Sequence, residues 1–86
     1  MEQQLDGNAA GGILHEIFPL EMTSVEATCT ACGATGPVGA LVVYMHAMGT
    51  IVRCPGCENE LIRIVHASGR YWLDMRGVRV LQIKEE

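Results

Sequence analysis

Four cysteines carry the most distinctive chemistry in this chain of 86 residues. They form two Cys-x-x-Cys pairs, Cys29 with Cys32 and Cys54 with Cys57, and 21 residues separate the pairs. Two residues between paired cysteines allow a tight turn to point both sulfurs at one ion. Four thiolates at about 2.3 Å suit a tetrahedral metal. The spacing therefore predicts a structural metal site with these four cysteines as ligands.

The residues around the pairs fit such turns. Gly33 permits the positive φ angle that cysteine knuckles commonly require, and Pro55 with Gly56 is expected to serve the second turn in the same way. The 21-residue spacer matches an outgoing strand, a turn and a returning strand, which would bring the pairs together. Four thiolates close the coordination shell, so the site is expected to stabilise the fold rather than catalyse a reaction.

Zinc (Zn2+) is the expected metal, because it would also stabilise a domain too small to have a large core. Iron is the alternative, since the same thiolates hold one iron in rubredoxins, and Cys54–Cys57 resembles the second knuckle of that family. Rubredoxins pack several aromatic residues near the iron, whereas this chain has one Trp, two Tyr and one Phe. A dithiol–disulfide enzyme would need a Cys-x-x-Cys pair at the start of a helix in a βαβ unit, and neither pair has this sequence context.

The remaining sequence predicts one small mainly-β domain over residues 1–86, with one N-terminal α-helix. Apolar residues recur at helical spacing over 5–18, with Asp6 as the N-cap and Pro19 as the end of the helix. Residues 25–83 are expected to form a zinc-ribbon-like antiparallel sheet of three to five strands. The expected strands are Val38–Ala47, Leu61–His66, Tyr71–Met75 and Val78–Ile83, with a short strand in Leu20–Thr28 and turns at Gly49–Thr50, Ser68–Gly69 and Gly77.

Composition excludes several classes of protein. The chain is 49% hydrophobic and 19% charged, which argues against disorder. Its apolar runs are far shorter than the roughly 20 residues that span a bilayer, so no membrane partner is expected. No basic region suggests a signal peptide, and a cytoplasmic location is expected. No catalytic motif is present, and His15, His46 and His66 are too widely spaced for a ligand pattern, so no enzyme activity is expected.

Charge is unevenly distributed. Residues 1–50 contain five acids and no Lys or Arg, whereas residues 51–86 contain all six basic residues and five acids. The net charge of −4 disfavours general binding to phosphate backbones, although the arginines of the second half keep nucleic acid as a candidate partner.

The segment from Tyr71 to Arg79 has two interpretations. It forms a strand with Trp72 or its neighbours in the core and Asp74 paired to an arginine, or it exposes an aromatic and arginine-rich surface for a partner. The residues of such an interaction surface would be Arg63, Arg70, Tyr71, Trp72, Arg76 and Arg79.

The two knuckles, with strands between and after them, resemble the zinc-ribbon superfamily over residues 25–83. The chain is also similar, over almost its whole length, to a family of short uncharacterised bacterial proteins, a domain of unknown function. The matching segments are Leu5–Ala9, Cys29–Ala34, Arg53–Cys57 and Trp72–Gly77. This resemblance implies a stand-alone small zinc protein and supplies no activity.

Three functions follow as expectations. The first is a non-catalytic zinc-binding module that mediates protein–protein interaction. The second is a nucleic-acid-binding, regulatory zinc ribbon that uses the arginines of the second half. The third is a rubredoxin-like iron electron carrier.

Overall fold

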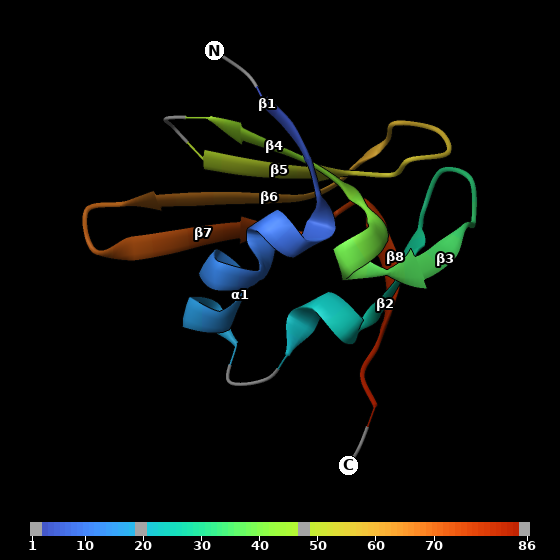
Figure 1. Ribbon diagram of the computed structural model, residues 1–86, viewed down its shortest axis with the longest axis horizontal. Coiled ribbons are helices and arrows are strands. Elements are labelled where there is room, and N and C mark those ends of the chain that lie inside the picture. The colour runs from blue at the N-terminus through green and yellow to red at the C-terminus, as the bar shows by residue number, and fades with distance from the viewer. Residues whose placement is uncertain (1–2, 19–20, 47–48, 85–86) are drawn as a thin grey trace.

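The computed structural model describes residues 3–18, 21–46 and 49–84, and it consists of two antiparallel sheets with a short helix (Figure 1). The first sheet has the strand order β1-β4-β5-β6-β7, and the second has the order β3-β2-β8. The elements are β1 (Gln3–Asp6), η1 (Gly7–Ala10), α1 (Gly11–Ile17), η2 (Met22–Ser24), β2 (Glu26–Cys29), β3 (Thr35–Pro37), η3 (Val38–Ala40), β4 (Val42–His46), β5 (Gly49–Arg53), β6 (Glu60–Ala67), β7 (Arg70–Asp74) and β8 (Val78–Gln82). The mainly-β class with an N-terminal helix is thus confirmed, but the strands form two sheets instead of one.

The N-terminal helix is shorter than predicted. Residues 3–6 form strand β1, in which Leu5 pairs with Val43, and residues 7–10 form a 3-10 turn before α1 begins at Gly11. Asp6 is an N-cap, but of the 3-10 turn rather than of the predicted α-helix: its carboxylate accepts a hydrogen bond from the Asn8 N–H at 3.0 Å. The N-cap of α1 is Ala10, which makes no side-chain cap hydrogen bond. The helix ends at Ile17, and Pro19 lies outside the described residues.

Two further corrections concern the segment before the second cysteine pair. Residues 38–40 form a 3-10 turn, so the strand predicted from Val38 begins only at Val42. Gly49 and Thr50 lie in β5 and pair with His46 and Met45, instead of forming the predicted turn. Residues 47 and 48 lie outside the described part of the chain.

The C-terminal half follows the prediction closely. Strand β6 covers the predicted residues, and β6 and β7 form a hairpin whose turn holds Ser68 and Gly69, both with positive φ (52° and 71°). Gly77 lies in the turn before β8. A Cβ at Gly77 would lie 2.0 Å from the Glu60 carbonyl oxygen, so only glycine permits this contact between the turn and the start of β6.

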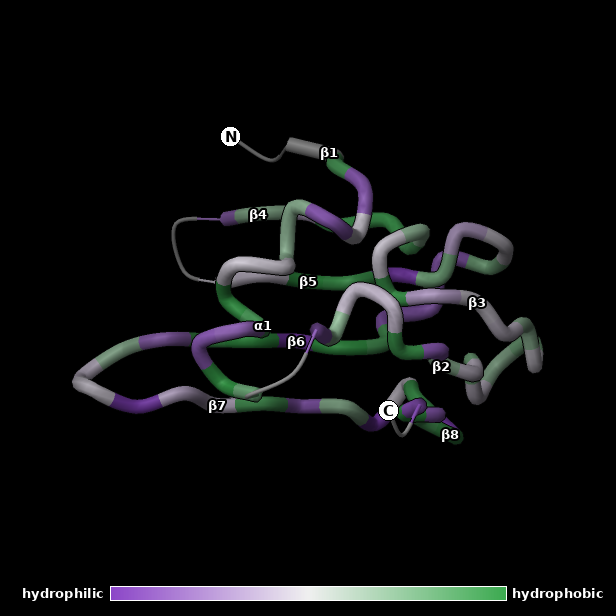
Figure 2. Tube along the Cα trace, turned by 60° about the horizontal axis from the view of Figure 1, so that its bottom comes forward, coloured by the Kyte–Doolittle hydropathy of each residue, from purple (hydrophilic) through white to green (hydrophobic). Residues whose placement is uncertain are grey.

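The core lies between the helical segments and one face of the five-stranded sheet, the inner face. Buried side chains from the helix and the sheet meet there, among them Leu14, Val43, Val52 and Ile64. Figure 2 shows hydrophobic stretches along the strands of this sheet. Within the described ranges, no helix has the length and apolar character needed to cross a membrane.

The opposite face of the sheet, the outer face, carries a continuous row of side chains across four strands. Register places Tyr44 opposite Ile51, Ile51 opposite Arg63, and Arg63 opposite Asp74. None of the four is buried. Side chains alternate between the two faces of a strand, so Trp72 shares the outer face with Asp74.

Candidate metal centre

The four cysteines converge at the ends of the two sheets. Cys29 ends β2, Cys54 follows β5, and Cys32 and Cys57 lie in the turns that come next. All four Sγ atoms lie within 4.8 Å of one another, and the Sγ pairs Cys29–Cys57 and Cys32–Cys54 are each 3.6 Å apart. A tetrahedral ion with metal–sulfur bonds of about 2.3 Å requires sulfur separations of about 3.8 Å. The four thiols are free and fit a single metal ion.

The two Cys-x-x-Cys turns, here called the knuckles, have the same backbone hydrogen bonds. In each, the first cysteine donates its N–H to the carbonyl five residues later and accepts a hydrogen bond from the N–H four residues later. These bonds are Cys29 N to Ala34 O (2.9 Å) and Gly33 N to Cys29 O (3.0 Å) in the first knuckle, and Cys54 N to Asn59 O (2.9 Å) and Glu58 N to Cys54 O (2.8 Å) in the second. The site is therefore built from two equivalent local structures.

The position after the second cysteine of each knuckle has a left-handed backbone. Gly33 has a φ of 76°, which confirms the positive angle predicted for this glycine, and Glu58 has a φ of 63°. The second knuckle was expected to rely on Pro55 and Gly56, but its positive φ falls on Glu58. Sequence reasoning missed this position because glutamate rarely adopts such angles.

The environment of the thiols favours a bound cation. The backbone N–H of Cys32, with a smaller effect from that of Ala31, lowers the pKa of Cys29 to about 6. Backbone N–H groups of Cys57 and Gly56 likewise lower the pKa of Cys54. The Asn59 N–H favours the Cys57 thiolate, but burial and hydrogen bonds with the other three thiols raise the pKa of Cys57 to about 12. A dication at the centre would displace the remaining protons and leave four thiolates.

Asn59 links the two knuckles outside the cysteine cluster. Its Nδ2 lies 3.6 Å from the Sγ of Cys29 and 3.5 Å from the Oγ1 of Thr30. The Thr30 N–H donates in turn to the Gly77 carbonyl at 2.9 Å, which ties the first knuckle to the turn before β8. Sequence reasoning did not identify Asn59. Its place two residues after the last cysteine was the only available indication.

Arg53 lies against the second knuckle. Its Nη1 donates to the carbonyl of Glu58 at 3.2 Å, and its guanidinium lies 3.8 Å from the carboxylate of Glu60. The guanidinium also lies 5.6 Å from the centre of the Tyr44 ring. Arg53 therefore holds the second knuckle against the outer face of the sheet.

The structure separates the residues of the predicted interaction surface. Trp72 is 51% exposed on the outer face, so it is not a core residue, and Arg63 lies on the same face. Tyr71 lies on the inner face, where its hydroxyl donates to Glu16 of α1 at 3.0 Å and its ring stacks on His66. Arg79 is exposed in β8, which belongs to the other sheet.

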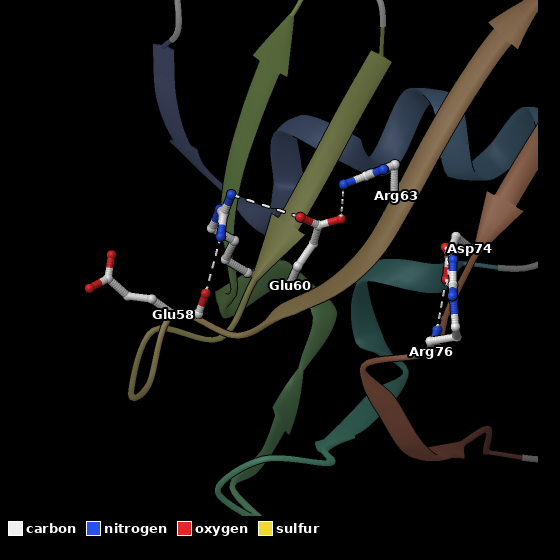
Figure 3. A network of polar contacts seen from close by, with 6 residues as sticks. Glu58, Glu60, Arg63, Asp74 and Arg76 are labelled. Atoms are coloured by element: carbon white, nitrogen blue, oxygen red, sulfur yellow. Dashed lines mark hydrogen bonds and ion pairs between the residues drawn. The ribbon is translucent and has the colours of Figure 1, made fainter.

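The expected ion pair of Asp74 is present. Arg76 bonds both carboxylate oxygens of Asp74 through its Nε and Nη2 atoms (Figure 3). This contact lowers the pKa of Asp74 to about 2. Both residues line a shallow hollow beside Trp72.

Fold and site together define a small mainly-β protein whose two antiparallel sheets meet at a four-cysteine site of metal-binding geometry. The chain matches the profile of the "Family of unknown function (DUF6510)" over residues 1–86, and it belongs to that family. Neither a curated protein nor a solved structure matches it.

Proposed function

We propose that this protein is a non-catalytic zinc module of the zinc-ribbon type, and that its outer face binds a protein partner. The observation that carries the proposal is the convergence of four Sγ atoms, within 4.8 Å of one another, from two equivalent knuckles. Cys29, Cys32, Cys54 and Cys57 would hold the ion, which would supply a permanent cross-link. Four protein ligands leave no coordination position for a substrate.

The position of the site supports a structural role for the metal. Cys29 belongs to the three-stranded sheet, and Cys54 directly follows β5 of the five-stranded sheet. Both cysteines are buried, with exposed fractions of 1% and 3%. An ion bound by both would fasten the two sheets together at the point where each knuckle leaves its strand.

The outer face supports a protein-binding role. It exposes Trp72, with Arg63 and Arg76 nearby, and tryptophan and arginine are the residues most enriched among the energetic centres of protein interfaces. Nucleic acid is the second candidate. It is disfavoured because Glu60 and Asp74, which bond these arginines, would also face the phosphates.

Metal analysis of the purified protein tests the zinc assignment. The chain would be expressed with zinc and iron both available, and its metal content and visible absorption would be measured. We expect one zinc per chain and a colourless protein. One iron per chain with visible absorption would refute the zinc assignment and support the rubredoxin-like alternative. A folded protein without metal would refute the metal centre. The double variant Cys32→Ser/Cys57→Ser is the control and should lose the metal.

A titration at low salt tests the choice of partner, because phosphate contacts are strongest there. A fluorescent single-stranded oligonucleotide should show no change in anisotropy with the zinc-loaded protein. Binding that weakens steeply with added salt would favour the nucleic-acid alternative. The fluorescence of Trp72, the single tryptophan of the chain, reports on the outer face in the same titration.

A further inference from the structure

Three hollows of the outer face meet at Arg63. The largest of the three, about 600 Å³, is lined by Trp72, Val65 and Arg76 among others, and Arg63 also lines the other two, which have volumes of about 160 and 310 Å³. Arg70 lies two residues before Trp72 and therefore on the same face of β7. We call these five residues the Trp72 surface.

The centre of the Trp72 surface is apolar. Trp72 lies directly opposite Val65 in the β6–β7 register, and the residue is 51% exposed. Met75 lines the same hollow. An indole is a large, rigid group, and an apolar side chain placed against it would remove substantial area from water.

The rim of the Trp72 surface is positively charged and held in place. Arg76 is fixed by Asp74 through Nε and Nη2, yet its side chain is 91% exposed. Arg63 is fixed by Glu60 at 2.7 Å, and its side chain is 53% exposed. A guanidinium has five N–H donors, so each arginine retains donors for a second carboxylate. Little side-chain entropy would be lost when that carboxylate binds.

We propose that the Trp72 surface binds a protein segment in which an apolar side chain is flanked by Asp or Glu. This inference rests on the proposed protein-binding function and names the chemistry of the partner. The apolar side chain would contact Trp72, and the carboxylates would contact Arg63, Arg70 and Arg76. A segment with one or two carboxylates matches the small positive excess of this surface better than a polyanion, whose many phosphates would meet Asp74 and Glu60 as well.

Selection from a random peptide library displayed on phage, with the zinc-loaded protein as bait, tests the proposal. The enriched peptide would be synthesised with a fluorescein label, and its affinity measured by anisotropy. We expect Asp or Glu beside an aliphatic or aromatic residue, and a change in Trp72 emission on binding. Arg76→Glu and Trp72→Ala should each weaken binding by about tenfold or more. Arg79→Glu, with the same change of charge in the other sheet, should have no effect. Zinc content and circular dichroism confirm that each variant is folded.

The other outcomes separate the two proposals. A selected peptide whose affinity is unchanged by Arg76→Glu and Trp72→Ala would overturn the Trp72 surface while supporting a protein-binding function elsewhere. Enrichment of basic peptides that bind at the Trp72 surface would refute the proposal that the partner segment carries Asp or Glu. If no peptide is enriched on the folded, zinc-loaded protein, both the surface and the protein-binding function fail. If the protein binds an oligonucleotide and Arg63→Glu abolishes that binding, the Trp72 surface is a nucleic-acid-binding surface instead.

Discussion

Gly33 and Glu58 occupy equivalent positions in the two knuckles, and both have left-handed φ angles, 76° and 63°. The N–H of each donates to the carbonyl of the first cysteine of its knuckle, at 3.0 and 2.8 Å. The backbone requirement is the same, but only one of the two residues is a glycine. A residue with a Cβ is strained in this region, so the second knuckle carries a conformational cost that the first does not.

This equivalence predicts opposite effects of two substitutions. Gly33→Ala should destabilise the zinc-loaded protein by about 1 kcal/mol, because alanine is strained at this φ. Beyond its chain neighbours, no described residue lies within 4 Å of a Cβ at Gly33, so we expect no steric clash to add to the cost. Glu58→Gly should stabilise by roughly 0.5 kcal/mol, because the relief of strain exceeds the entropy that glycine adds to the unfolded chain. Urea unfolding in zinc-saturated buffer measures both changes. A loss of stability in Glu58→Gly would contradict the equivalence.

The site was predictable from the sequence to the extent that its chemistry is local. The spacing of Cys29, Cys32, Cys54 and Cys57 identified the cluster, because the tight turn of a Cys-x-x-Cys pair points both of its sulfurs toward the same point. The contact of Asn59 with Cys29 depends on how two segments 30 residues apart in sequence meet, and no local pattern encodes it. The interpretation of Trp72 was open for the same reason, since alternation along a strand does not say which face is covered.

Removal of the proposed zinc ion should unfold the protein. Binding free energies at structural zinc sites, roughly 10–16 kcal/mol, are comparable to the whole stability of a small domain. A strong zinc chelator in excess at neutral pH should abolish the β-sheet circular dichroism, and added zinc should restore it. The metal-free variant Cys32→Ser/Cys57→Ser should resemble the chelated protein. An unchanged spectrum after complete loss of metal would show that the two sheets hold together without it.

Asn59 should contribute to metal affinity without being a ligand. Hydrogen bonds to ligand atoms orient them, and their loss typically weakens metal binding by about 10- to 100-fold. We expect Asn59→Ala to lower zinc affinity within this range in competition with a chromophoric chelator. Asn59→Asp should lower it further, because a carboxylate would replace the donor beside Cys29. Gln82→Ala, at an exposed position of β8, is the control. Equal affinities in Asn59→Ala and the control would limit Asn59 to a packing role.

The contact between Tyr71 and Glu16 should make stability fall at high pH. Burial, followed by the hydrogen bond to Glu16 and its charge, raises the pKa of Tyr71 above its ordinary value of 10.0. The phenol must keep its proton to donate, so its contribution is complete below pH 10.0 and is lost as pH rises through the raised pKa. Tyrosinate absorbance should show a component that Tyr71→Phe removes and that Glu16→Ala shifts to lower pH. The stability difference between the wild type and Tyr71→Phe should shrink over the same pH range. A constant difference would show that the hydrogen bond does not contribute.

The fold was predictable where periodicity and turn residues agree, as in the β6–β7 hairpin at Ser68–Gly69. It was mispredicted where packing decides, as at the N-terminus. The apolar spacing over 5–18 suits a helix. However, Leu5 gains a sheet partner in Val43, and Gly7 packs directly against the backbone of η3. These tertiary contacts override local propensity, and the chain is diverted into a strand and a 3-10 turn before α1.

Gly7 and Gly12 therefore give a matched test of this account, since both belong to the predicted helix. A Cβ at Gly7 would lie 1.7 Å from the Val38 carbonyl oxygen, so Gly7→Ala should destabilise by about 3 kcal/mol through displacement of η1 from η3. Apart from its neighbours and the backbone of its own helix, no atom of the described residues lies within 4 Å of a Cβ at Gly12, which is exposed in α1. Gly12→Ala should stabilise by roughly 0.5–1 kcal/mol through its higher helix propensity. Urea unfolding in zinc-saturated buffer distinguishes the two. If both substitutions stabilise, residues 7–10 tolerate a continuous helix, and the close contact with Val38 does not determine where α1 begins.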